Sequence, residues 1–135
     1  MSKSVTMSES ELQEAIIQLA HVLNFKVAHF RPALCKRGGA LVYRTPVAAD
    51  GAGFFDLILA KPGRIIAVEC KSAKGKRTPE QVAWAEAVEG ACEYYCWKPD
   101  QWDSIVEILN TQNGHEDTQN GHYPRSEEVI HGASR

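Results

Sequence analysis

Two short apolar segments joined by a tight turn constrain the fold of this chain more than any other feature. Residues 54–60 and 64–70 are rich in Phe, Ile, Leu and Val, and the triplet Lys-Pro-Gly at 61–63 separates them. Runs of this length and composition are typical of buried β-strands, and a turn-forming triplet between them favours antiparallel pairing. We therefore predict an antiparallel β-hairpin over residues 54–70.

Helical patterns lie on both sides of this hairpin in the sequence. Residues 8–23 have apolar side chains at helical spacing, and Ser8 with Glu11 has the form of a capping box. The segment Thr-Pro-Glu-Gln at 78–81 is typical of a helix start, so we predict a helix to residue 88 or 89, ended by Gly90. A last helix is expected from residue 99 or 100 to residue 109 or 110.

The rest of the chain supplies shorter strands and a polar end. We predict strands over 25–30, 40–45 and 92–97, with a turn-prone segment from Pro32 to Gly39. A chain of 135 residues suits one domain, here residues 1–110, of the α/β class with a mixed central sheet flanked by helices. Residues 111–135 contain the repeat Thr-Gln-Asn-Gly-His twice and no apolar period, which predicts a flexible tail.

Charge is distributed unevenly along the chain. The formal net charge is −2, and the tail from residue 111 carries all of it, so residues 1–110 are neutral. Within that neutral part, four cations and no acids fall between residues 71 and 77: Lys71, Lys74, Lys76 and Arg77. This cluster is either a solvated loop or a basic patch that contacts nucleic-acid phosphates.

The chain lacks the apolar run needed to span a bilayer, and its first residues lack the apolar stretch of a secretory signal. We therefore expect no membrane partner and a cytoplasmic location. Cysteines of a cytoplasmic protein are expected to be reduced.

Three residues on the predicted hairpin have the chemistry of a metal-assisted site. Glu69 and Lys71 are two positions apart, so on a strand they share one face while Cys70 points to the other. Asp56 lies on the partner strand, where pairing would bring it toward Glu69, although the sequence leaves the register open. The alternative is an edge-strand charge pair with an unrelated carboxylate near a turn.

Oxygen ligands of this kind suit Mg²⁺, with Mn²⁺ as a substitute, rather than a closed zinc site. The backbone carbonyl of Cys70 is a candidate further ligand beside Asp56 and Glu69. A divalent ion with a nearby lysine stabilises charge that develops on a phosphate, so phosphodiester hydrolysis is the reaction that this pattern favours.

The same residues resemble a known family, the PD-(D/E)XK nuclease superfamily, and within it the virus-type replication-repair nuclease (VRR-NUC) branch. The likeness extends over most of residues 8–110. It rests on this ordered set: Ser8-Glu9 with Leu12-Gln13, Gly53-Phe54-Phe55-Asp56-Leu57, Val68-Glu69-Cys70-Lys71, Gly75, Thr78 to Gln81, Trp84, and Trp97 to Asp100 with Trp102.

The resemblance implies a role for each matching residue. Asp56 and Glu69 are similar to the metal-binding carboxylates, and Lys71 to the catalytic lysine. Glu9 corresponds to a first-helix carboxylate that reaches the metal through water, with Glu11 as the alternative. Gln81 resembles the glutamine that positions the substrate or the lysine. Phe55 departs from the family, which often has proline or serine before the aspartate.

Five cations outside the metal-binding set are candidate DNA contacts. Three of them belong to the 71–77 cluster, and two follow or end predicted strands: Lys74, Lys76, Arg77, Arg31 and Arg44. Alternatively, Arg31 and Arg44 are surface arginines that contact no phosphate.

The resemblance also implies a restriction-endonuclease-like fold and a Mg²⁺-dependent DNA endonuclease. Stand-alone members of the branch are virus-like or prophage-like, which would place the protein in a bacterial host cell. They are homodimers that cut branched DNA such as four-way (Holliday) junctions. Two alternatives stay open: a nuclease for flaps, single strands or duplexes, and a catalytically silent DNA-binding module.

Overall fold

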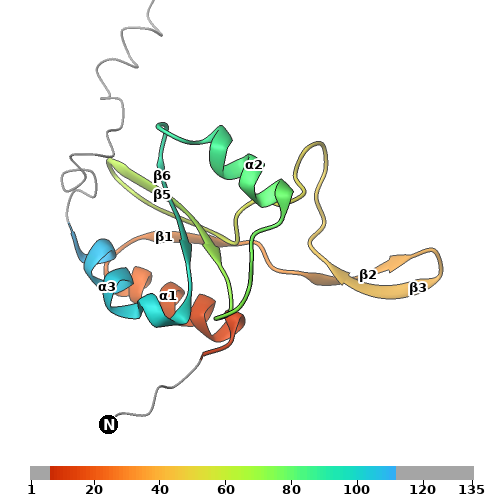
Figure 1. The fold of residues 1–135 in the computed structure, drawn as a ribbon, viewed down its shortest axis with the longest axis horizontal. Helices are drawn as coiled ribbons and strands as arrows, with labels where there is room; N and C mark the ends of the chain where they lie inside the picture. Colours follow the sequence, from red (N-terminus) through yellow and green to blue (C-terminus); the bar gives the residue numbers. More distant parts are fainter. Residues whose placement is uncertain (1–6, 112–135) are drawn as a thin grey trace, which may run out of the picture.

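A four-stranded sheet forms the centre of the protein, whose computed structural model describes residues 7–111 (Figure 1). The strand order is β1-β4-β5-β6, with bounds β1 Lys26–His29, β4 Leu57–Lys61, β5 Arg64–Cys70 and β6 Glu93–Trp97. β4 pairs antiparallel with both β1 and β5, and β6 is parallel to β5. The predicted mixed α/β architecture is therefore confirmed.

Three α-helices accompany this sheet: α1 (Glu9–Val22), α2 (Pro79–Ala87) and α3 (Trp102–Asn110), the last preceded by a 3₁₀ turn, η1 (Pro99–Gln101). In Figure 1, α1 and α3 lie together on one side of the sheet and α2 on the other. Ser8 caps α1 and Thr78 caps α2, each in a complete capping box. Both predicted helix starts are confirmed. None of the helices among residues 7–111 is long and apolar enough to cross a membrane.

The hydrophobic core lies between one face of the sheet and the helices α1 and α3. Side chains two apart on β4 and β5 reach the same face, and they pack with apolar residues of both helices. Fully buried members are Leu12, Ile16, Leu57, Leu59, Ile66, Val68, Cys70 and Ile105. The opposite face of β5 therefore carries the alternate residues, which include Glu69.

The predicted hairpin strand at residues 54–60 begins later than expected. β4 starts at Leu57, so Asp56 lies directly before the strand rather than within it. The reason is a set of aromatic contacts: the Phe54 ring packs edge-on against Phe30 at 5.3 Å and Trp84 at 4.9 Å between centroids. The backbone N–H of Asp56 still donates to Val68 O at 3.0 Å, so pairing with β5 continues through this residue.

The segment Pro32–Gly39 was expected to be turn-prone, and this prediction is wrong for most of its length. Residues Ala33–Arg37 form β2, which pairs antiparallel with β3 (Ala40–Arg44) as a separate two-stranded sheet. Only Gly38 and Gly39 turn, at φ of 55° and 85°. Two consecutive glycines with positive φ permit a two-residue hairpin turn.

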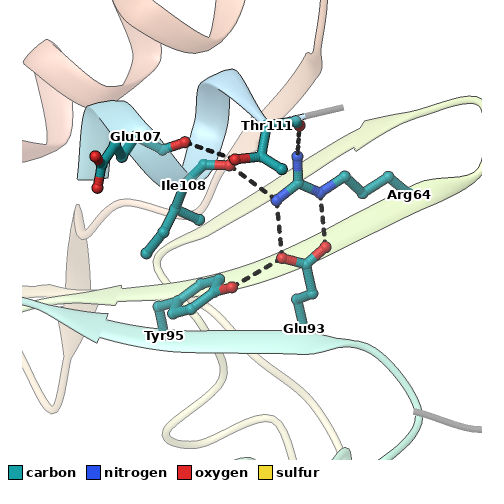
Figure 2. Close-up of polar contacts among 6 residues, drawn as sticks. All are labelled: Arg64, Glu93, Tyr95, Glu107, Ile108 and Thr111. Atoms are coloured by element: carbon teal, nitrogen blue, oxygen red, sulfur yellow. Dashed lines mark hydrogen bonds and ion pairs between the residues drawn. The ribbon is translucent and has the colours of Figure 1, made fainter. Parts of the chain in front are cut away.

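A buried ion pair fixes the end of α3 to the sheet (Figure 2). The Arg64 guanidinium donates from Nε and Nη2 to the two oxygens of Glu93, at 2.6 and 2.9 Å. It also donates to the carbonyls of Ile108, at 3.0 Å, and Thr111, at 2.7 Å. Tyr95 donates its hydroxyl to Glu93 at 2.9 Å. The network satisfies carbonyls that a helix end leaves without intrahelical partners. The tail predicted for residues 111–135 lies, from residue 112 onward, outside the described residues.

Candidate functional site

Glu69 is the centre of a polar group at the end of β5. It is fully buried, on the face of the sheet opposite the hydrophobic core. Its Oε1 accepts a hydrogen bond of 3.1 Å from Gln81 Nε2, whereas Oε2 has no hydrogen-bond partner. A buried carboxylate with an unused oxygen is costly for a folded protein, so this atom is available for a ligand.

Helix α2 aims Gln81 at this carboxylate through its own capping box. Thr78 N donates to Gln81 Oε1 at 2.9 Å, which leaves the amide nitrogen directed toward Glu69. Gly53 lets the helix approach closely: its φ is 82°, and a Cβ there would meet the Glu80 backbone at 2.6 Å. These contacts hold the Gln81 side chain in one orientation, which is what the predicted positioning role requires.

Asp56 is placed beside Glu69 by the hairpin register. Leu57 pairs with Val68, so extension of the register by one residue sets Asp56 opposite Glu69. Asp56 Oδ2 accepts a bond of 2.7 Å from Cys70 N. Burial raises the pKa of Asp56, while this bond, the charge of Lys71 and a hydrogen bond from the Gln13 side chain oppose the increase.

Glu9, at the start of α1, and Lys71, directly after β5, complete the group. Burial raises the pKa of Glu9 first, and the negative charge of Asp56 raises it further, whereas Lys71 lowers it. Glu9 therefore lies within electrostatic reach of Asp56 and Lys71. Glu11 instead accepts the Ser8 N–H in the capping box, so the structure brings Glu9 rather than Glu11 to the predicted site.

Burial and neighbouring charges together shift the pKa of Glu69. This pKa is raised to about 8, mainly by burial and further by the negative charges of Asp56 and Glu9. The cations Lys71 and Arg77 act in the opposite direction. Near neutral pH the protein therefore holds a proton on Glu69 unless another cation enters the site.

Whether a divalent ion fits this site depends on the oxygen atoms that Asp56 and Glu69 offer as ligands. Among residues 7–111 no group of three or more His, Cys, Asp or Glu side chains is arranged to hold an ion by itself. Asp56 and Glu69 form a pair, however, and Glu69 Oε2 is a buried oxygen without a hydrogen bond. Mg²⁺ is bound through one or two carboxylates and keeps several waters, so an all-oxygen pair of this kind fits it.

The predicted DNA-contacting cations fall in three places. Lys74, Lys76 and Arg77 are exposed in the loop between β5 and α2, and Arg77 donates to the Tyr94 hydroxyl at 3.4 Å. Arg44, at the end of β3, lines a cavity of about 500 Å³ together with Asp56 and Gln81. Arg44 thus shares a cavity with Asp56, and the charge of Arg77 acts on Glu69. Arg31 lines a different cavity, between α1 and Tyr43.

Sequence reasoning did not assign a role to Gln13, which hydrogen-bonds Asp56. Its Oε1 also lies 3.0 Å from His29 Nε2, so the amide joins α1 to β1 and to the site. The available signal was spacing: Gln13 is four residues after Glu9 and therefore on the same helix face.

No protein-family model matches this chain, and no curated protein matches it significantly. The resemblance to the VRR-NUC branch accordingly stays a prediction from the residues that carry it.

Proposed function

We propose that the protein is a Mg²⁺-dependent DNA endonuclease with Asp56, Glu69, Lys71, Gln81 and Glu9 as its site. The observation that carries the proposal is the Glu69 carboxylate, buried beside Asp56 with Oε2 unpartnered. A buried carboxylate oxygen without a partner is costly, and replacing such a group by an apolar residue is often neutral or stabilising. A cation bound by Asp56 and Glu69 would give this oxygen a partner.

In this proposal Asp56 and Glu69 hold the ion, with the Cys70 carbonyl as a further ligand and Glu9 acting through water. When bound, Mg²⁺ stabilises negative charge on a phosphate oxygen and makes water a stronger acid. Hydrolysis forms a bond from water oxygen to phosphorus and breaks a bond from phosphorus to a sugar oxygen, which gains a proton.

The protein's own side chains have separate tasks in that reaction. The Lys71 ammonium stabilises charge on the phosphate oxygens and orients the attacking water. Gln81 keeps the Glu69 carboxylate in one orientation through the bond at 3.1 Å. Lys74, Lys76 and Arg77 contact the DNA backbone, which fixes the position of the substrate without selecting its sequence.

The resemblance further supports a homodimer that acts on four-way junctions, a restriction-endonuclease-like core, and a cytoplasmic place of action. Two sites related by a twofold axis would cut both sides of a junction. This part of the proposal rests on analogy with the family.

A substrate panel tests the proposal. The protein would be incubated in Mg²⁺ or Mn²⁺ with a four-way junction, a flap and a linear duplex that share one sequence. We expect metal-dependent cleavage, with the junction cut fastest. Equal cleavage of all three substrates would contradict junction specificity. Binding without cleavage in either metal, with unchanged binding by Asp56→Ala, would instead identify a silent DNA-binding module.

A further inference from the structure

The β2–β3 hairpin extends away from the rest of the protein (Figure 1) and forms its own two-stranded sheet. Four large apolar side chains on it are exposed: Leu34 at 53%, Leu41 at 62%, Val42 at 37% and Tyr43 at 74%. An isolated two-stranded hairpin is only marginally stable in water, and exposed apolar patches mark interaction sites. The hairpin is therefore expected to have a binding partner.

The pairing register divides the hairpin into two different faces. Leu34 pairs with Tyr43 and Lys36 with Leu41, so these four side chains share one face. The other face carries Arg37 and Arg44 on either side of the pair Cys35 and Val42. One face is thus mainly apolar, and the other presents two guanidinium groups.

Charge identifies the class of partner. Residues 27–49 contain four cations and no aspartate or glutamate: Arg31, Lys36, Arg37 and Arg44. Three of these four lie on the hairpin itself. A surface with this balance complements a polyanion.

The position of the hairpin relative to the candidate site identifies the polyanion. Arg44, at its base, lines the cavity of about 500 Å³ that also contains Asp56, Gln81 and Phe54. The cavity therefore joins the base of the hairpin to the carboxylates. Nucleic acid with a phosphate at the site would continue along the hairpin.

We propose that the β2–β3 hairpin is a DNA-binding arm that enters the major groove of the duplex next to the cleaved phosphate. A two-stranded β-ribbon fits this groove. Its cations contact phosphates on the groove walls, and its apolar face meets base edges. This inference rests on the proposed nuclease function and adds an element that holds the duplex outside the metal site.

Fluorescence anisotropy with a labelled DNA duplex in EDTA tests the arm without cleavage. The double variant Lys36→Ala, Arg37→Ala removes two exposed cations from the hairpin. Each lost phosphate contact should lower affinity roughly tenfold at 0.1 M salt and reduce the salt slope by about 0.9. Lys36→Arg, Arg37→Lys should restore both values. Lys26→Ala is the control, because this exposed cation lies at the far end of β1 from the site.

Unchanged affinity and salt slope in the alanine variant would overturn the proposal. The competing partner is a second copy of the chain, which sedimentation of Leu34→Ser, Leu41→Ser would reveal. If the wild-type protein is a dimer and this variant is a monomer with unchanged DNA affinity, the hairpin serves self-association and the arm proposal is refuted.

The binding and cleavage assays together distinguish failure of the arm proposal from failure of the nuclease proposal. If the wild-type protein cleaves DNA but the Lys36→Ala, Arg37→Ala variant binds DNA with normal affinity, only the arm proposal is refuted. If the alanine variant binds DNA more weakly but the wild-type protein cuts no substrate, only the nuclease function is refuted.

Discussion

A negative charge on Glu69 is unfavourable in the free protein, because its carboxylate is buried and one oxygen lacks a partner. The folded protein reduces this cost by raising the pKa of Glu69 to about 8, so that the group keeps a proton near neutral pH. A divalent cation would reverse this balance by stabilising the ionised form. Stability and the proposed metal binding would therefore be linked through one side chain.

This linkage predicts how stability depends on pH without metal. The unfolded state releases the Glu69 proton near 4.5, and the folded state near 8, so the folded state binds more protons between these values. The free energy of unfolding should fall as pH rises from 5 to 8. Urea denaturation in EDTA would measure it. Glu69→Gln should show a smaller decrease, and equal slopes for both proteins would contradict the assignment.

Metal binding has a readout that needs no DNA. Addition of Mg²⁺ at pH 8 should raise the melting temperature, since a ligand at ten times its Kd stabilises by about 1.4 kcal/mol. Asp56→Asn should lose most of this shift. Asp103→Asn, an exposed acid on α3, is the matched control and should keep it. Equal shifts in the two variants would place the ion elsewhere.

Individual site residues could be predicted to different degrees. Glu69 and Lys71 could be placed on one face because alternation along a strand is short-range information. Asp56 was expected near Glu69 from pairing across the hairpin, and the structure supplies the register. The sequence favoured Glu9 but left Glu11 as the alternative, because both suit a helix start. The capping bond of Glu11 with Ser8 and the electrostatic reach of Glu9 to Asp56 distinguish them. Gln13 was missed because its contact with Asp56 is a long-range one.

At the scale of elements, α2 supplies Gln81 only because Gly53 lets the helix approach. Gly53→Ala should destabilise the protein by about 1–3 kcal/mol, through the positive φ and the contact at 2.6 Å with Glu80. Gly63→Ala is the control, because its φ is 83° and its Cβ would meet nothing within 4 Å. Denaturant unfolding should show the larger loss for Gly53→Ala, and equal losses would mean that the close approach is unimportant.

The ion pair of Arg64 and Glu93 makes a second prediction at this scale. Arg64→Ala leaves a buried carboxylate unpaired, so the free energy of unfolding should fall by about 3–5 kcal/mol. The double variant Arg64→Met, Glu93→Leu removes both charges and should be more stable than Arg64→Ala, as measured by urea denaturation. A double variant less stable than the single one would show that the pair itself, rather than charge compensation, stabilises the fold.

Element predictions succeeded where local signals were strong. Capping boxes marked both helix starts, and the Lys-Pro-Gly turn marked the central hairpin. The segment 32–39 was misassigned because proline and glycine at its ends resemble a loop, while β2 is formed by pairing across Gly38 and Gly39. The start of β4 was misplaced because aromatic packing of Phe54 outweighs its strand preference.

For the whole molecule, the fold places acidic and basic groups next to each other. Asp56 and Glu69 lie at one end of β4 and β5, with the cationic 71–77 loop following directly and Arg44 across the shared cavity. Carboxylates are required for a metal ion, and cations are required for the phosphate backbone. This arrangement supports the proposal that a chain with a neutral body binds DNA at one location.

The central claim is that this group of residues hydrolyses phosphodiesters, and single-turnover cleavage tests it most directly. Wild type, Lys71→Ala and Lys26→Ala would each be mixed, at enzyme concentrations that saturate binding, with a labelled four-way junction and Mg²⁺. We predict cleavage by wild type and by Lys26→Ala, with the rate of Lys71→Ala lower by roughly 10²–10³-fold. No cleavage by wild type, or equal rates for wild type and Lys71→Ala, would contradict the claim.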